Sequence, residues 1–234
     1  MVDENKVIRS RHEFKYLCSK NQLALLNTRL KPIMKLDEHT QGSFTYRIRS
    51  IYFDDFKNSS FFENEDGITP REKWRIRAYN ENCTSISLEC KRKEYDKVIK
   101  DSCRLTLEQY NGVVSGKYFS FNSENKLLNR FIILQKNNLL KPKVIVGYER
   151  TPYIYKDGNV RITFDMNLFS SPDIKNFFEK SIRKRPILPT STHMVEVKYD
   201  EYLPDFISKT VQSSNMERIT FSKYYYSRKY SIIC

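Results

Sequence analysis

The sequence predicts an α+β protein centred on a closed antiparallel β-barrel of about eight strands, with helices inserted between the strands. Three observations point to this fold. Segments that alternate apolar and polar residues recur along the whole chain, which is the period of a half-buried strand. The chain has 16 Tyr and 15 Phe, which favour strands, but only 6 Gly. Basic residues outnumber acidic ones on most of the polar faces, and the formal net charge is +13.

The N-terminal part begins with a predicted strand and a predicted helix. Residues 11–18, RHEFKYLC, alternate charged and aromatic or apolar side chains. Ser19 can then cap a helix whose leucines recur at helical spacing until Pro32 ends it. A long alternating strand is predicted at 44–55. The polar stretch 58–67, NSSFFENEDG, is expected to form a loop or a short helix.

The clearest strand pair is a hairpin formed by Glu72 to Tyr79 and Ser85 to Lys93. The first segment, EKWRIRAY, places its basic residues on one face and its apolar residues on the other, and the second segment does the same. A hairpin whose charged face meets water would show the same pattern. The pattern gains weight because it recurs in the other predicted strands.

Three strands and a helix are predicted after this hairpin. Residues 99–107 alternate as a strand, and five apolar side chains recur at helical spacing within Ser123 to Asn138. Segments 143–155 and 160–169 are predicted to pair as a hairpin, because Asp157-Gly158 is a strong turn signal.

The C-terminal part adds one strand and one helix. Residues 193–199, HMVEVKY, form the last predicted strand, and 203–212 form a helix that carries Pro204 in its first turn. The tail, ITFSKYYYSRKY, is basic and aromatic, and no element is assigned to it. Because no repeat or linker interrupts the pattern, we expect residues 1–234 to form a single domain.

Closure of the sheet would bury its edges, which long strands otherwise expose. If the charged faces point inward, the following residues would share one basic tunnel: Arg11, Lys15, Lys73, Arg75, Arg77, Lys91, Lys100, Arg104, Arg150, Arg161 and Lys198. Neighbouring cations about 4 Å apart repel by roughly 4 kcal/mol at an effective dielectric constant of 20. We therefore expect the tunnel to hold water and to be suited to a polyanion. Tyr52, Asp54 and Tyr148 are expected to support its wall by hydrogen bonds.

Composition limits the possible partners and the cellular location. The isoelectric point near 9.4 indicates an anionic partner, such as nucleic acid, an acidic membrane surface or a phosphate-rich molecule. No apolar run approaches the roughly 20 residues of a membrane span, and the N-terminus lacks the apolar core of a signal peptide. Five scattered cysteines without CxxC spacing favour a reducing cytoplasm and no zinc site. Without a glycine-rich phosphate loop, any phosphate must be bound by side chains.

Eight motifs, in chain order, resemble the VTC (vacuolar transporter chaperone) polyphosphate polymerase domain, a branch of the triphosphate tunnel metalloenzymes. The motifs are RHEFKY, RSIYFDD, KWRIRAY, LECKRK, YERTPY, RITFD, MVEVKY and FSKY. They span roughly Arg9 to Arg228. The resemblance implies the triphosphate tunnel fold, a divalent metal (Mn²⁺ or Mg²⁺) and transfer of the γ-phosphate of ATP to a growing polyphosphate chain. Arg11 stands where the wider superfamily has the first Glu of a Glu-x-Glu-x-Lys signature, which fits the VTC branch.

The same resemblance implies roles for individual residues. Eight cations would grip the reacting phosphates: Lys15, Arg75, Arg77, Lys91, Arg150, Arg161, Lys198 and Lys223. Seven further residues are candidates for binding substrate: Arg11, Glu13, Lys73, Glu89, Lys100, Arg104 and Ser222. Glu196 would hold the metal, whose other ligands water and phosphate oxygens can supply. Glu13 and Glu89 have a structural alternative, because each can hold a neighbouring cation by an ion pair.

Polyphosphate polymerase is the favoured function, with ATP and inorganic polyphosphate or triphosphate as partners. No nucleic acid is expected, and a membrane-associated partner is compatible with the sequence. One alternative is a metal-dependent hydrolase of tripolyphosphate or nucleoside triphosphate with the same fold. The other is a non-catalytic module that binds polyphosphate or nucleic acid. Such a module would cluster its cations in one surface patch, whereas here they are spread over many strands.

Overall fold

The computed structural model describes residues 11–37, 40, 43–95, 97–117 and 124–232. The strands are β1 (His12–Ser19), β2 (Lys35–Leu36), β3 (Tyr46–Asp54), β4 (Arg71–Tyr79), β5 (Ile86–Glu94), β6 (Lys97–Leu105), β7 (Lys141–Tyr155), β8 (Val160–Ser171), β9 (Arg185–Pro186), β10 (Thr192–Tyr199) and β11 (Glu217–Arg218). The α-helices are α1 (Lys20–Leu30), α2 (Ser59–Glu65), α3 (Leu107–Ser115), α4 (Lys126–Asn138), α5 (Asp205–Gln212) and α6 (Lys223–Ile232). Short 3₁₀ turns lie at η2 (Asp157–Asn159) and η3 (Ile174–Asn176).

The predicted strands and three of the predicted helices are confirmed within a few residues. Helix α1 shows why: the Ser19 hydroxyl accepts from the Gln22 N–H at 3.3 Å, and the Gln22 side chain accepts from the Ser19 N–H at 2.8 Å. This reciprocal capping fixes the first turn. The leucines at helical spacing, Leu23, Leu26 and Leu30, are all buried.

Two helices were not predicted. The strand expected to continue to residue 107 ends at Leu105, because Thr106 caps α3 by accepting from the Gln109 N–H at 3.1 Å. The basic, aromatic tail forms α6. The part of the predicted second helix before residue 124 lies outside the described residues.

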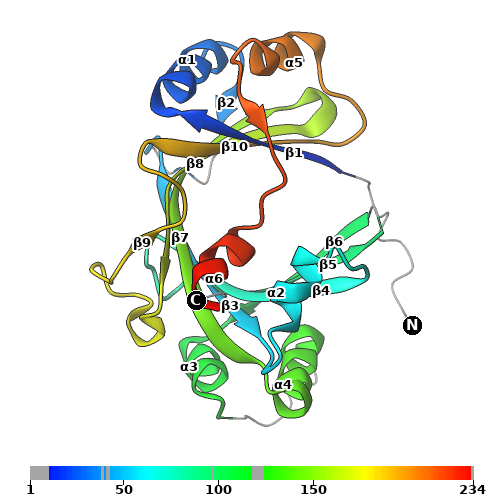
Figure 1. Cartoon of the computed structure of the whole chain (residues 1–234), viewed down its shortest axis with the longest axis vertical. Helices are drawn as coiled ribbons and strands as arrows, with labels where there is room; N and C mark the ends of the chain where they lie inside the picture. Colours follow the sequence, from blue (N-terminus) through cyan, green and yellow to red (C-terminus); the bar gives the residue numbers. More distant parts are fainter. Residues whose placement is uncertain (1–10, 38–39, 41–42, 96, 118–123, 233–234) are drawn as a thin grey trace.

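The strands form one antiparallel sheet that does not close. In the described part of the chain its order is β11-β1-β10-β8-β7-β3-β4-β5-β6, with β2 beside β7 and β9 beside β8. The closed barrel is therefore not confirmed. On the other edge of β1 lies β11, which pairs with it through Tyr16↔Arg218 and Leu17↔Glu217. From β11 the chain turns inward to α6, which lies within the bend of the sheet (Figure 1).

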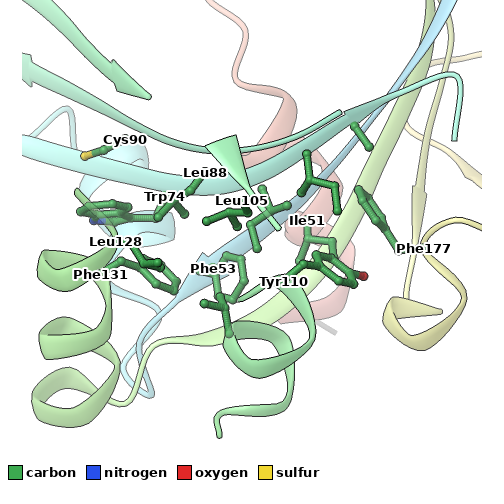
Figure 2. Packing of buried hydrophobic residues seen from close by; sticks show 14 of the residues in the cluster. Ile51, Phe53, Trp74, Leu88, Cys90, Leu105, Tyr110, Leu128, Phe131 and Phe177 are labelled. Atoms are coloured by element: carbon green, nitrogen blue, oxygen red, sulfur yellow. The ribbon is translucent and has the colours of Figure 1, made fainter. Parts of the chain in front are cut away.

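Helices cover the outer faces of both halves of the sheet. Helices α3 and α4 pack on β3 to β6 through a buried hydrophobic cluster (Figure 2). In this cluster the ring centroids of Trp74 and Phe131 lie 5.2 Å apart. Helices α1 and α5 cover β8 and β10 in the same way, with Leu26 and Ile207 fully buried. Because the apolar side chains of β4, β5, β8 and β10 face these helices, alternation places the charged side chains of these strands on the inner face.

Among the described residues, no helix combines the length and the apolar character that crossing a membrane requires.

Candidate functional site

The inner face of the sheet is concave and charged. Lys91 on β5 and Glu13 on β1 form an ion pair at 3.4 Å, although several strands separate β5 from β1 in the sheet. The sheet must therefore bend until its two ends face each other. We call the charged residues gathered inside this bend the inner cluster: Glu13, Lys15, Lys73, Arg75, Arg77, Glu89, Lys91, Lys100, Arg150, Asp165, Glu196, Lys198 and Lys223.

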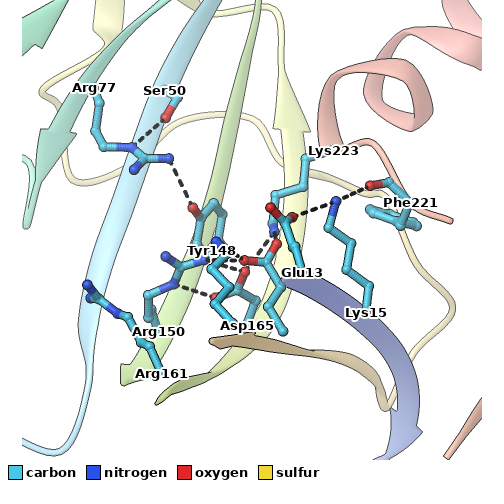
Figure 3. A network of polar contacts seen from close by, with 12 residues as sticks. Glu13, Lys15, Ser50, Arg77, Tyr148, Arg150, Arg161, Asp165, Phe221 and Lys223 are labelled. Atoms are coloured by element: carbon cyan, nitrogen blue, oxygen red, sulfur yellow. Dashed lines mark hydrogen bonds and ion pairs between the residues drawn. The ribbon is translucent and has the colours of Figure 1, made fainter. Parts of the chain in front are cut away.

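The centre of the inner cluster is a largely buried network of two carboxylates and three cations, of which Figure 3 labels Arg150, Asp165 and Lys223. Arg150 donates two hydrogen bonds to Asp165, at 2.6 and 2.7 Å. Lys223 bridges Asp165 and Glu196, at 2.7 and 3.0 Å. Lys198 also donates to Glu196 at 3.0 Å. Since the Asp165 side chain is 0% exposed and that of Glu196 is 7% exposed, these charges depend on one another rather than on water.

This network keeps both carboxylates ionised. Burial by itself would raise the pKa of Glu196, but Lys198, Lys223 and Arg150 outweigh it and hold the pKa well below 4.5. The pKa of Asp165 is lowered by Arg150 and Lys223 in the same way. In return, the two carboxylates raise the pKa of Lys223 in spite of its burial. Asp165, Glu196 and Lys223 are therefore charged near neutral pH.

A second group surrounds Glu89 on β5. Its carboxylate accepts from Arg75 at 2.7 Å and from Lys100 at 2.9 Å, and Arg77 lies 3.9 Å away. The burial of Glu89 is offset by these cations, which lower its pKa. Glu89 thus forms the ion pairs that its structural alternative describes, and it orients the two arginines of β4. Its role in binding substrate stays a prediction.

The expected wall residues act as hydrogen-bond partners. The Tyr52 hydroxyl accepts from Arg75 at 3.0 Å, and the Tyr148 hydroxyl accepts from Arg77 at 3.3 Å. Asp54 instead accepts from the hydroxyl of Tyr224 on α6, at 2.5 Å. These contacts fix the arginines and also fasten α6 to the inner face.

Glu13 joins the two ends of the sheet. It pairs with Lys15 at 3.0 Å and with Lys91 at 3.4 Å. Burial would raise its pKa, but Lys198, Lys91 and Lys15 together lower it to about 2. Glu13 therefore serves as an ion-pair partner between β1 and β5.

Among the described residues, three of the predicted site residues form no ion pair with the inner cluster, although Arg161 lies on the inner face opposite Lys198 (Figure 3). Arg11 approaches Asp200 at 3.5 Å, and Arg161 pairs with Asp37 at 2.9 Å. Arg104 is exposed on β6, and no ion pair to it is found among the described residues. The other predicted residues are brought together, including Ser222, which accepts from Lys73 at 3.0 Å.

The buried carboxylate that sequence reasoning missed is Asp165. A signal was present: Asp165 ends the RITFD motif and, by the period of two from Arg161, lies on the same face of β8. Its burial between Arg150 and Lys223 could not be deduced, because alternation does not show which strands meet across the bend.

A divalent metal fits this site only in part. Among the described residues, no group of three or more His, Cys, Asp or Glu side chains could enclose a metal. One oxygen of Glu196 accepts from Lys223 and the other from Lys198. Glu196 could thus serve as one ligand, with bound phosphate and water supplying the others.

Acid should destabilise the protein through Glu13. Because the folded pKa of about 2 lies below the ordinary value of 4.5, its stabilisation is present above pH 4.5 and is lost as the pH falls towards 2. Between about pH 5 and pH 3, Glu13 alone should lower the free energy of unfolding by about 2 kcal/mol. Urea denaturation followed by circular dichroism at both pH values measures this loss.

The control is the variant Glu13→Gln, beside the exposed surface change Glu201→Gln. The stability difference between wild type and Glu13→Gln should shrink as the pH falls, while Glu201→Gln should follow the wild type. A difference for Glu13→Gln that stayed constant from neutral to acid pH would contradict the ion-pair role of Glu13.

An antiparallel sheet bent around a basic inner face, with its apolar faces covered by helices, defines the class of triphosphate tunnel folds. More specifically, the chain belongs to the VTC domain family, whose family model matches residues 10–232. A search of curated proteins found no match.

One solved structure supports the fold. A proposed adenylate cyclase from Bacillus halodurans superposes with a TM-score of 0.54 at 14% identity, over 92% of this chain and 94% of that chain. The PH1819 protein from Pyrococcus horikoshii gives a TM-score of 0.48 at 14% identity, over 92% and 96% of the two chains. At such low identity, the first similarity shows the fold alone.

Proposed function

We propose that this protein is a polyphosphate polymerase, which transfers the γ-phosphate of ATP to a growing inorganic polyphosphate chain on its inner face. Family membership and the basic inner cluster support a triphosphate-type substrate. The observation that favours polymerisation over hydrolysis is the state of the carboxylates. Glu13, Glu89, Asp165 and Glu196 are all engaged by cations, and all have lowered pKa values.

A carboxylate with a lowered pKa is a poor general base. Attack by water benefits from a base that takes its proton, whereas the oxygen of an acceptor phosphate is already ionised at neutral pH. The inner cluster thus offers charge stabilisation and positioning, the two things that phosphoryl transfer needs most. An anionic acceptor can use both without a base.

The cations are also arranged for a linear substrate. Lys73, Arg75 and Arg77 alternate along β4, so neighbouring members lie about 7 Å apart and the row covers about 13 Å. In this proposal Arg75, Arg77, Arg150 and Lys223 hold the transferred phosphoryl group and its neighbours. Lys15, Lys91 and Lys198 hold the rest of the chain. A Mn²⁺ or Mg²⁺ ion on Glu196 and the phosphate oxygens would neutralise charge that develops during transfer.

The test is product analysis with the full chain, ATP and Mn²⁺. We expect acid-insoluble polyphosphate to accumulate after a lag, and added short polyphosphate to remove the lag by supplying the acceptor. Arg75→Ala, prepared in parallel, should produce none and so exclude a contaminating kinase. If nearly all released γ-phosphate were orthophosphate, primed or not, the protein would be a hydrolase. If triphosphate bound without turnover, it would be a binding module.

A further inference from the structure

Lys73 differs from the other lysines of the inner cluster in its partners. Its ammonium group donates to the side-chain oxygen of Asn64 on α2 and, at 3.0 Å, to the hydroxyl of Ser222. Among the described residues, no carboxylate lies within ion-pair distance of it, whereas Lys15 and Lys91 both pair with Glu13. An anion arriving at Lys73 would therefore break no ion pair, and it would meet the two polar side chains that already lie beside the ammonium group.

The charges around Lys73 are mostly of its own sign. Lys91 is directly opposite on β5, Lys15 approaches from β1, and Arg71 precedes it on β4. Burial, and then these three cations, lower the pKa of Lys73 to about 7, while Asp54 on β3 acts in the opposite direction. The protein groups around Lys73 therefore supply more positive than negative charge.

The segment just before α6, Phe221 and Ser222, also lies beside Lys73. Lys15 donates to the backbone carbonyl of Phe221 at 2.8 Å, next to the Ser222 hydroxyl that Lys73 holds. The next residue, Lys223, reaches the central carboxylates Asp165 and Glu196. Three consecutive residues therefore run from the Lys73 site to the centre of the inner cluster, so a phosphate at Lys73 would lie beside the reacting group.

We propose that Lys73, Asn64 and Ser222 form a subsite that recognises the terminal phosphate of the polyphosphate acceptor; this rests on the proposed function. A terminal phosphate carries a charge of about −1.5 to −2 near neutral pH, as phosphate monoesters do, whereas an internal phosphate carries a single charge. The ammonium of Lys73 forms a charge-assisted hydrogen bond to the additional charge. The Ser222 hydroxyl and the Asn64 amide supply further donors. The subsite thus distinguishes a chain end from the interior of a chain.

Comparing a linear with a cyclic phosphate tests this selectivity. Tripolyphosphate has two terminal phosphates, whereas cyclic trimetaphosphate has none. By calorimetry without metal, wild type should prefer the linear anion. Lys73→Met should weaken linear binding by about tenfold, the loss expected for one charge-assisted hydrogen bond, with cyclic binding unchanged. Lys209→Met, on the exposed surface of α5, is the matched control and should bind as wild type does.

A second measurement is the number of protons that the protein takes up when it binds tripolyphosphate. At about pH 8 the terminal phosphate is already ionised, so any proton taken up from solution on binding must bind to a group of the protein. Wild type should take up protons with tripolyphosphate, seen as a dependence of the binding enthalpy on the buffer. Lys73→Arg, which stays charged, should retain the affinity but lose the uptake. This variant also guards against a folding defect in Lys73→Met, and melting temperatures of all variants are compared.

Elongation assays place the subsite on the acceptor. Lys73→Met should raise the KM for short linear polyphosphate by about tenfold and leave the KM for ATP within about twofold. The proposal is overturned if Lys73→Met matches wild type, if linear and cyclic binding fall equally, or if only the KM for ATP rises. If wild type bound neither anion, the proposed function would fail as well. If end-selective binding depended on Lys73 but no polyphosphate formed, the polymerase assignment would fail and end recognition would stand.

Discussion

Replacing Asp165 with alanine is expected to lower the free energy of unfolding by about 3–5 kcal/mol, enough to unfold a marginally stable domain. Asp165 is fully buried, accepts two hydrogen bonds from Arg150 and pairs with Lys223. Its loss leaves two buried cations with Glu196 as their remaining carboxylate partner in the network. The measurement is urea denaturation of wild type and variant, followed by circular dichroism.

Two controls separate charge loss from simple truncation. Asp165→Asn keeps the shape and one acceptor, so it should lose the charge compensation but leave no cavity. Asp173→Ala breaks an ion pair with Arg183, whose side chain is 79% exposed, and should change stability little. An Asp165→Ala protein as stable as wild type would show that the central network does not hold the inner face together.

Glu196→Gln is expected to reduce metal-dependent turnover of ATP by about 100-fold or more, because a metal supplies several kcal/mol of transition-state stabilisation. The amide is a weaker metal ligand than the carboxylate and carries no charge. Binding of tripolyphosphate without metal should persist or tighten, since Lys198 and Lys223 lose a competing anion. The assays are initial rates over a Mn²⁺ titration, and thermal melting with millimolar tripolyphosphate.

Arg75→Ala is the contrasting variant, because it should weaken tripolyphosphate binding itself. Its guanidinium is held by Glu89 and Tyr52 and aimed into the inner cluster. Wild-type turnover by Glu196→Gln, with an unchanged response to Mn²⁺, would remove Glu196 from the metal site. Loss of tripolyphosphate binding in Glu196→Gln would instead give Glu196 a structural role.

Most of the sheet could be predicted, because strands such as β4 and β5 have an apolar outer face and a charged inner face. The hairpin of β7 and β8 is an example: Asp157-Gly158 makes the turn, and Tyr155 pairs with Val160 as the alternation requires. The same alternation correctly placed Arg75, Arg77 and Lys91 on the inner face. Local sequence was sufficient wherever one face met a hydrophobic core.

The open sheet, where closure was expected, and the helix of the tail could not be predicted, since both depend on contacts between distant segments. Alternation assigns a face to each strand but does not show that β11 occupies the edge of β1. The helix α6 lacks a single apolar stripe, because Tyr224, Tyr225 and Tyr226 are consecutive. It forms because Tyr224 stacks on Tyr52 at 5.2 Å and bonds Asp54. Helix α6 is therefore stabilised by its contacts with β3 rather than by an amphipathic pattern of its own.

On one side of the inner face, side-chain contacts rather than backbone hydrogen bonds connect the two ends of the open sheet. In the described part of the chain no backbone ladder joins β6 to β1, and the Glu13–Lys91 pair spans this side with side chains that are 26% and 43% exposed. Backbone hydrogen bonds would hold the circumference at any ionic strength, whereas a partly exposed ion pair weakens as salt screens it. High salt should therefore loosen this side of the wall, where the Glu13–Lys91 pair and the contacts of Phe221 and Ser222, rather than strand pairing, connect the two parts of the sheet.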